Sequence, residues 1–470
     1  MKTSETPLNH RQKESIDTLL GDPKKAIMKL SVPMIIAMSI QTLYNLVDTL
    51  WVSGLGSDAL ASVGFVFPFI FLAMAIATGI GIGGGSAISR KIGAKNKAGA
   101  DSVAAHTIVI MVIASFLFMI PVLVFAEPLF AMMGAGRTTA MAATYAQIFV
   151  AGSLFLFFSF AANSILRAEG DAKRVMFAMI FGGVLNVILD PIFIYSFGWG
   201  VPGAAWATVL SMAISSILLL YWMFWKKDTY VSISLKGFRF DTTIIKDIFQ
   251  VGLPASVMQV SMSIMMLIMN LIVVSVGGID GVAVFSAGWK VATMATMPLL
   301  GMATAVVSVT GAAYGARALK KLDVSHLYAI KIGIVIEVAI ASATFVLAPF
   351  IAAAFTQAEG SVRIADDITI FLQIICIFYP ASAFGILSSA VFQGIGKGIN
   401  SLIVTIIRTI IFIPPLAWLF STTFHLGLPG AWWGLVTANI LGGAITFLWV
   451  KLYIKKLLIL SNQGETSEYS

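Results

Sequence analysis

Long apolar runs follow one another along almost the whole chain, and short polar connectors separate them. A run of about 18 or more apolar residues is long enough to cross a membrane as an α-helix. The pattern predicts an all-α membrane protein with twelve transmembrane helices. These helices are expected near residues 27–53, 60–88, 103–126, 140–163, 175–197, 203–225, 248–275, 282–310, 327–349, 368–390, 401–421 and 430–453.

The basic residues of the connectors predict how the chain is oriented. Counted from the N-terminus, the even-numbered connectors contain sixteen lysines and arginines, whereas the odd-numbered ones contain only Arg137 and Arg363. Positively charged loops stay on the cytoplasmic side of a membrane. Both ends of the chain are therefore predicted to be cytoplasmic, which requires an even number of spans. We expect a multi-pass protein of the cell membrane, surrounded by lipids and acting as a monomer.

An internal repeat divides the chain into two halves. Ser31-Val32-Pro33 opens the first run and Gly252-Leu253-Pro254 opens the seventh, and similar Pro-Gly-Ala segments stand near the start of the sixth and twelfth. Six spans in each half make the two repeats parallel, a design known from alternating-access transporters. We predict two pseudo-symmetric six-helix lobes around a central cleft. The boundaries are a cytoplasmic N-terminal tail (1–26), a first lobe (27–225), a cytoplasmic connector (226–247), a second lobe (248–453) and a cytoplasmic C-terminal tail (454–470).

The composition supports a lipid environment and excludes several other classes. Hydrophobic residues make up 59% of the chain and charged residues only 11%, whereas soluble domains carry about 25% charged residues. The net charge of +8 lies mainly in the connectors, so no nucleic-acid partner is expected. The single cysteine, Cys376, excludes an intrachain disulfide. Because no catalytic constellation of His, Ser or metal ligands is visible, we expect neither an enzyme nor a bound cofactor.

Two carboxylates stand deep in the spans of the first lobe. Asp48 and Asp190 are ionisable residues inside apolar runs, and such residues are costly in lipid and usually functional. At about 1.5 Å of rise per residue, both lie in the outer half of the bilayer. Tyr145 and Thr208, near the outer ends of two other spans, reach the same depth. The four side chains are therefore expected to converge.

Local spacing strengthens this prediction. Gln41, Tyr44 and Asp48 stand at i, i+3 and i+7 and share one helix face. Asn186 and Asp190 stand at i and i+4 and also share a face. Carboxylate, amide and hydroxyl oxygens are ligands that a hard cation prefers, while burial also suits a carboxyl group to carrying a proton. The sequence therefore predicts a site for Na⁺ or H⁺ formed by Asp48, Asn186, Asp190 and Thr208.

The seventh span carries a stripe of methionines. Met258, Met262, Met265 and Met269 recur at helical spacing. Methionine is flexible and polarizable, so a Met-lined wall can accept ligands of varied shape. The stripe predicts either the lining of an adaptable cavity or an ordinary packing surface. Three further ionisable residues in the second lobe, Lys290, Glu337 and Arg408, are interpreted as structural or gating groups.

Several motifs in order along the chain match one family. They are Gln41–Asp48 with the preceding Pro33, Gly54–Ala59, Arg167–Asp171, Asn186–Pro191 and Gly203–Thr208. With these, the chain resembles the multidrug and toxic compound extrusion (MATE) transporters over nearly its whole length. The acidic pattern of the first lobe looks most like the archaeal and DNA-damage-inducible (DinF) branch. The NorM branch carries acidic residues in its seventh and tenth helices, where this chain has only Asp366 and Asp367 at the mouth of the tenth.

The resemblance implies a secondary antiporter. It would export organic, often cationic compounds such as drugs or toxic metabolites, in exchange for inward Na⁺ or H⁺. Substrate contact or proton relay is assigned to Gln41, Tyr44, Asn45 and Tyr145. The alternative is a flippase for a lipid-linked precursor. That function would favour a strongly cationic cavity, whereas buried cations are expected to be few here, namely Lys290 and Arg408.

Overall fold

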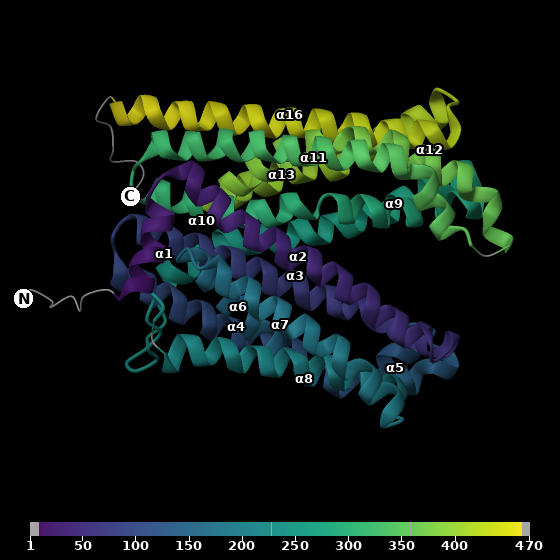
Figure 1. The fold of residues 1–470 in the computed structure, drawn as a ribbon, viewed down its shortest axis with the longest axis horizontal. Helices are drawn as coiled ribbons and strands as arrows, with labels where there is room; N and C mark the ends of the chain where they lie inside the picture. Colours follow the sequence, from purple (N-terminus) through teal and green to yellow (C-terminus); the bar gives the residue numbers. More distant parts are fainter. Residues whose placement is uncertain (1–8, 227, 358, 463–470) are drawn as a thin grey trace, which may run out of the picture.

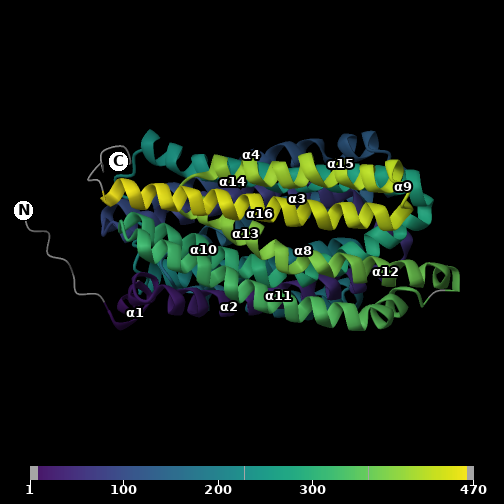
Figure 2. The same ribbon diagram turned by 90° about the horizontal axis from the view of Figure 1, so that it is seen from above.

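The computed structural model describes residues 9–226, 228–357 and 359–462, and all regular structure in these residues is helical. Most helices run along the long axis of the molecule in both views (Figure 1, Figure 2), and Figure 1 shows them arranged in two bundles. Helices α2 to α8 form the first bundle and helices α9 to α16 form the second. The predicted all-α membrane fold is confirmed.

The first bundle contains one sharply bent span. Helices α5 and α6 bend by 43° at Gly152, where a Cβ atom would lie 2.5 Å from Val209 of α8. The predicted single helix near 140–163 is therefore two shorter ones. In chain order the elements are α2 (Pro23–Ser53), α3 (Ser57–Gly93), α4 (Lys97–Met132), η1 (Gly136–Thr138), α5 (Thr139–Ala151), α6 (Ser153–Ala168), α7 (Ala172–Pro191), η2 (Ile192–Ser196), α8 (Gly200–Leu220) and η3 (Tyr221–Trp225).

The second bundle has more breaks within its spans. A short 3₁₀ segment, η5, interrupts the tenth span, and π-helical turns interrupt the eleventh. The elements are α9 (Thr242–Ala295), α10 (Met297–Gly315), α11 (Leu319–Phe355), η4 (Glu359–Ile364), α12 (Ala365–Ile375), η5 (Cys376–Phe378), α13 (Tyr379–Gly394), α14 (Gly398–Ile406), η6 (Ile407–Phe412), α15 (Ile413–Trp418), η7 (Leu419–Thr423) and α16 (Gly427–Asn462). Among the described residues, eleven helices are long and apolar enough to cross a membrane, and the bent pair α5–α6 makes twelve.

Helix α9 contains a reversal of the chain. Gly278 has φ 61° and ψ −153°, a backbone conformation that glycine adopts readily and L-residues with side chains rarely do. Ile248 near the start of α9 packs against Gly83, and Gly315 at the end of α10 packs against Arg90, so both lie at the same end of α3. The seventh span therefore ends at Gly278, and the eighth consists of the rest of α9 and of α10, as the sequence pattern predicted.

Glycines on α3 bring the two bundles into contact. A Cβ atom on Gly83 would lie 2.1 Å from the carbonyl oxygen of Ile248, and one on Gly93 would lie 2.0 Å from that of Ala312. Both partners belong to the second bundle, and small residues allow such close backbone approach. The two bundles converge at the end of the molecule that holds both termini and diverge toward the other end (Figure 1). We call the first of these the termini end.

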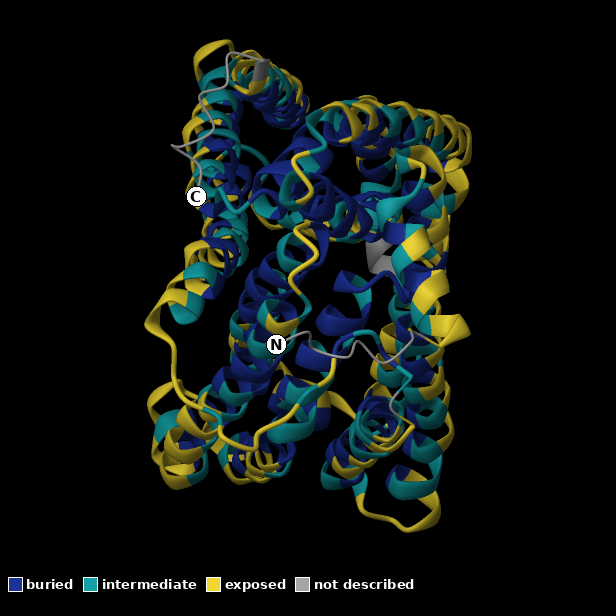
Figure 3. Cartoon of the chain, turned by 90° about the vertical axis from the view of Figure 1, so that its left-hand side faces the viewer, coloured by how far each residue is buried: buried dark blue, intermediate teal, exposed yellow. Residues whose placement is uncertain are grey.

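Apolar side chains cover the outside of both bundles. Leu117, Val346 and Phe350 are 71%, 68% and 72% exposed. Seen from the termini end, buried segments lie inside and exposed residues lie along the periphery (Figure 3). Large apolar side chains in such numbers are unfavourable in water but not in lipid. The surface therefore agrees with a membrane protein.

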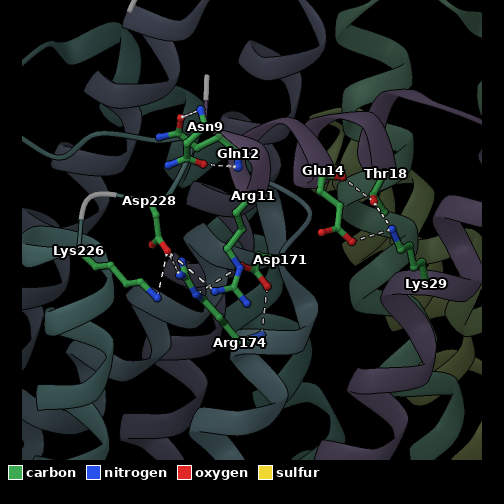
Figure 4. Close-up of polar contacts among 10 residues, drawn as sticks. All are labelled: Asn9, Arg11, Gln12, Glu14, Thr18, Lys29, Asp171, Arg174, Lys226 and Asp228. Carbon is green, nitrogen blue, oxygen red and sulfur yellow. Dashed lines mark hydrogen bonds and ion pairs between the residues drawn. The ribbon is translucent and has the colours of Figure 1, made fainter. Parts of the chain in front are cut away.

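The segment predicted to be an N-terminal tail folds in part as helix α1 (His10–Leu20), and α2 already begins at Pro23. Arg11 of α1 forms ion pairs of 3.9 Å with both Asp171 and Asp228 (Figure 4). On its other side, Lys321 of α11 donates to the carbonyl oxygen of Leu20 at 2.8 Å. Helix α1 therefore contacts both bundles at the termini end. At the other terminus α16 extends to Asn462, beyond the predicted end at 453.

The connector between the bundles, residues 228–241, has no helix or strand and lies on the first bundle. Three of its backbone N–H groups donate to side chains of that bundle: Val231 to Glu169 (2.9 Å), Ser232 to Asp101 (2.8 Å) and Asp241 to His106 (2.9 Å). A chain segment without secondary structure needs such partners for its backbone. The connector is therefore fixed to the first bundle rather than loose between the two.

The stability that the connector gains from its bond to Glu169 should depend on pH. Burial raises the pKa of Glu169 from its ordinary value of 4.5 to about 8. The folded protein therefore holds this proton where the unfolded chain has lost it. Its contribution to the free energy of unfolding is complete below pH 4.5 and is lost as the pH rises to about 8.

We expect the melting temperature of the purified protein to fall by about 2–5 °C between pH 5 and pH 8.5 on this account. Glu169→Gln keeps an oxygen that accepts from Val231 and should flatten the dependence. Glu14→Gln is the matched control, since Lys29 lowers the pKa of the exposed Glu14. An equally steep pH dependence in Glu169→Gln would contradict this assignment.

Candidate ion-coupling site

Three helices of the first bundle bring the predicted cation-coupling residues together. Asp48 lies on α2, Asn186 and Asp190 lie on α7, and Thr208 lies on α8. The Nδ2 atom of Asn186 donates to Oδ1 of Asp190 at 3.3 Å and to Oγ1 of Thr208 at 3.4 Å. Asn186 and Asp190 are buried, with 4% and 0% of their surface exposed. The amide thus links the carboxyl group of its own helix to the hydroxyl group of the next.

The carboxyl groups of Asp48 and Asp190 lie within interaction distance of each other. Oδ1 of Asp48 and Oδ2 of Asp190 are both buried, and neither accepts a hydrogen bond from any described residue. Two carboxylates this close repel each other when both are ionised, and an unpaired buried charge is costly. The arrangement is satisfied by a proton on one group or by a cation between them. All candidate ligands are oxygen atoms, which suits a hard cation such as Na⁺.

Aromatic residues border this pair. Tyr145 of α5 is 5% exposed and lies close enough to interact with both carboxyl groups. Tyr44 interacts with Gln41 on its own helix, and its ring packs where a Cβ atom on Gly183 of α7 would lie only 2.8 Å away. Tyr44 and Tyr145 therefore lie close to the carboxyl pair, and Gln41 lies beside Tyr44 on the same helix.

Asn45 is placed differently from its neighbours. Its side chain lies on an exposed face of α2 and forms no hydrogen bond with either carboxyl group in the part of the chain that the structure describes. The reason is geometric, because one residue after Tyr44 the helix has turned by about 100°. The structure does not bring Asn45 into the site.

The methionine stripe of α9 divides into two parts. Met265 and Met269 are 0% exposed and belong to the core of the second bundle, so they line no open surface in this conformation. Met262 is half-buried, as is Met258, whose sulfur accepts hydrogen bonds from Ser401 and Thr405. The prediction that the methionines share one helix face was correct. Only Met258 and Met262 have accessible atoms, so a role as cavity lining is limited to these two.

The other ionisable residues of the second bundle have contrasting surroundings. Lys290 is exposed. Glu337 is fully buried, and neither of its carboxyl oxygens accepts a hydrogen bond from a described residue. Arg408 packs its aliphatic stem against Gly442, where a Cβ atom would lie 2.6 Å from Cγ. The two basic residues therefore lie in different environments, one exposed and the other packed against a glycine.

One contact beside the carboxyl pair was not predicted from the sequence. The hydroxyl group of Tyr195 in η2 donates to the carbonyl oxygen of Trp51 in α2 at 2.6 Å. The two helices that it joins are those that carry Asp190 and Asp48. A tyrosine in an apolar run a few residues after Asp190-Pro191 was the available signal, although its partner is a backbone atom that no sequence pattern marks.

Comparison with known proteins identifies the family. A family model described as MatE matches residues 33–192 and 254–419, which is well over half of the chain. The chain belongs to the MatE family. The match covers both bundles, so it includes the helices of the carboxyl pair and those of the methionine stripe. The expected family is therefore confirmed.

Individual relatives agree over nearly the full length. The chain is 26% identical over 438 residues to the multidrug export protein MepA of Staphylococcus aureus (strain NCTC 8325 / PS 47), covering 93% of this chain and 95% of that protein. A crystal structure of a MATE in complex with MaL6 is 46% identical, with a TM-score of 0.92, covering 94% and 99% of the two chains. A MOP superfamily transporter from Pyrococcus furiosus Vc1, in which reverse polarity of the binding pocket suggests a different function, is 45% identical with a TM-score of 0.92 over 96% and 99%.

These findings make the chain a multi-pass membrane transporter of the MATE type. Its relatives are transporters and not enzymes, which agrees with the missing catalytic constellation in the sequence. The two bundles of transmembrane helices, which meet at the termini end, are therefore those of a transporter. The carboxyl pair in the first bundle is the natural candidate for its coupling chemistry.

Proposed function

We propose that this MATE transporter is a secondary multidrug antiporter, which exports organic, mainly cationic compounds in exchange for Na⁺ or H⁺. The observation that carries the proposal is the carboxyl pair Asp48–Asp190, in which each residue keeps one buried oxygen without a hydrogen-bond donor among the described residues. A pair of this kind requires a positive charge and responds when it arrives or leaves. The multidrug export protein MepA, similar over nearly the whole chain, supports the substrate class.

The coupling ion would bind between the carboxyl groups. As Na⁺ it would take oxygen ligands from Asp48, Asn186, Asp190 and Thr208; as H⁺ it would sit on one carboxyl group, with Tyr145 nearby. In either form the ion neutralises one negative charge in the first bundle. A cationic drug bound nearby loses its electrostatic partner at that moment, so the two ligands disfavour each other. This antagonism is what exchange requires.

Alternating access would use the contact between the bundles. In this structure the bundles touch through α3, α9 and α10 at the termini end. With cytoplasmic termini, as the basic connectors predict, the conformation is closed toward the cytoplasm. Rocking of the bundles would then open the termini end. Met258 and Met262 offer adaptable contacts to the drug, and the protein would work as a monomer in the cell membrane, surrounded by lipid.

A flippase for a lipid-linked precursor is the second candidate. The observation that favours it is the relative from Pyrococcus furiosus Vc1, in which reverse polarity of the binding pocket suggests a different function. A precursor with a pyrophosphate headgroup requires clustered cations. Lys290 is exposed and Arg408 is packed against glycine, which does not favour a binding site for a pyrophosphate headgroup at these two residues. Drug export remains the proposal.

Transport in proteoliposomes tests the proposal. Ethidium export would be measured with an imposed Na⁺ gradient, an imposed H⁺ gradient, or neither. We expect export against its own gradient with at least one of the two ions and none without a gradient. Export that ignores both ions would refute ion-coupled antiport. Failure to move ethidium, together with translocation of a fluorescent polyprenyl-diphosphate lipid, would favour the flippase.

A further inference from the structure

A hydrogen bond closes the far side of the carboxyl pair. Tyr195 lies five residues after Asp190, and Trp51 lies three residues after Asp48. The hydroxyl group of Tyr195 donates to the Trp51 carbonyl oxygen at 2.6 Å, and the two rings meet edge to face with centroids 6.1 Å apart. This contact joins the ends of the two carboxylate-bearing helices just beyond the carboxyl groups.

The Trp51 carbonyl is available because α2 ends there. In a continuing α-helix it would accept from the N–H group of Leu55, but that N–H bonds to Val52 instead at 3.0 Å. The last carbonyl groups of a helix lack partners within the helix and need others. Tyr195 supplies the donor across the gap to α7, and it does so from the π-helical turn η2 that follows Pro191.

Gly54 is fitted to this contact by size. A Cβ atom at this position would lie 2.3 Å from the hydroxyl oxygen of Tyr195, but 3.5 Å from its Cζ atom. The backbone of Gly54, with φ −65° and ψ −15°, is a conformation that any residue adopts. The hydroxyl group of Tyr195 therefore leaves no room for a side chain at position 54, whereas the backbone conformation of Gly54 would accept one.

We propose that Tyr195 is a positioning residue for the coupling ion. Its bond to Trp51 holds the outer end of α2 against α7 and so fixes the separation of Asp48 and Asp190. The affinity of a site made of two carboxyl groups depends steeply on their separation. The inference rests on the proposed role of that pair, and it adds a residue that contacts neither the ion nor the drug.

Tyr195→Phe removes only the hydroxyl group and keeps the ring. We expect the concentration of coupling ion that gives half-maximal ethidium export to rise about fivefold, the effect of one lost hydrogen bond on an affinity. The maximal rate should stay near the wild-type value, because neither carboxyl group is changed. Tyr221→Phe, an exposed tyrosine of η3 near the termini end, is the matched control and should leave the ion dependence unchanged.

Gly54→Ala is the second variant, and it attacks the same bond from the other side. Its methyl group would displace the Tyr195 hydroxyl group, so this variant alone should show the same fivefold shift. In Tyr195→Phe the methyl group has room, because 3.5 Å to Cζ is an ordinary contact. The double variant should therefore show no more than a single shift.

The outcomes separate this inference from the proposed function. The positioning role would be overturned if the effects of Tyr195→Phe and Gly54→Ala multiplied in the double variant. It would also be overturned if the properly folded single variants kept the ion dependence of the wild type. Coupled export that persists in Asp48→Asn and Asp190→Asn would instead overturn the ion site itself. Size-exclusion chromatography and thermal melting of each variant establish that it is folded. A lowered maximal rate with unchanged ion dependence would assign Tyr195 to conformational change and also contradict the inference.

Discussion

Asp48→Asn and Asp190→Asn should each reduce ion-driven ethidium export at least about tenfold while leaving the amount of folded protein unchanged. Asparagine keeps the shape of the side chain but has no negative charge and takes up no proton. The variant site therefore neither attracts Na⁺ nor carries H⁺. Folding should tolerate the change, because each replacement removes a buried charge that lacks a complete set of partners.

Asp58→Asn is the matched control for this experiment. Asp58 lies at the same end of the first bundle, but it is 47% exposed and paired with Arg137 at 2.7 Å. An exposed pair contributes little, so export by this variant should equal that of the wild type. If the two site variants exported ethidium as well as this control under an ion gradient, the carboxyl pair would have no part in coupling.

Arg90→Ala should shift the protein toward a conformation open at the termini end. Arg90 of α3 pairs with Asp247 of α9 at 2.6 Å and donates to the carbonyl oxygen of Gly394 at 3.3 Å. It also donates to Ser86, whose hydroxyl group in turn donates to Gln393. Apart from the Arg90–Ser86 bond within α3, these contacts cross from the first bundle to the second, so they exist only while the termini end is closed.

The expected size of the effect follows from the exposure of the pair. Arg90 is 12% and Asp247 is 33% exposed, so part of the interaction is screened by water. The loss of the charged hydrogen bonds should cost the closed state about 1–2 kcal/mol. That corresponds to a shift of about tenfold in the ratio of closed to open molecules. Distances between spin labels placed on the two bundles at the termini end would measure it.

Lys451→Ala provides the comparison, because Lys451 pairs with Asp323 at 2.5 Å within the second bundle. That pair moves as one unit, so its loss should leave the distance distribution unchanged. Combining Arg90→Asp with Asp247→Arg should restore part of the closed population. An unchanged distribution in Arg90→Ala would show that the other contacts between the bundles, such as the glycine contacts of α3 and those of α1, keep this end closed without Arg90.

The length of the apolar runs predicted the spans, and the spacing of residues within single helices predicted part of the site. Apolar length predicted the spans, although not the bend at Gly152. The break near Gly278 was predicted correctly because the connector that contains it interrupts the apolar run. The i, i+4 spacing of Asn186 and Asp190 predicted their shared face, and the structure joins them by a hydrogen bond. Counting residues from the membrane surface also predicted that Asp48 would reach Asp190, because helical rise is nearly constant.

Other features depended on how helices are rotated and spaced. Asn45 was grouped with the site but is exposed, and Met265 and Met269 were grouped with Met258 and Met262 but lie in the core. A helix that is apolar on all sides carries no amphipathic signal to say which face meets a neighbour. Its rotation is decided by packing, which sequence spacing along a single helix does not contain.

By itself, then, the sequence determined that this protein is a membrane carrier with an acidic pair in its first half, since helix length, charge placement and helical spacing are local properties. The tertiary structure alone decided which parts meet. Arg90 finds Asp247 across 157 positions and Tyr195 finds Trp51 across 144. One of these contacts closes the termini end and the other closes the far side of the carboxyl pair. Both contacts require two backbone segments to come close together. Glycines leave room for this approach, but only the packing of the bundles determines which segments meet.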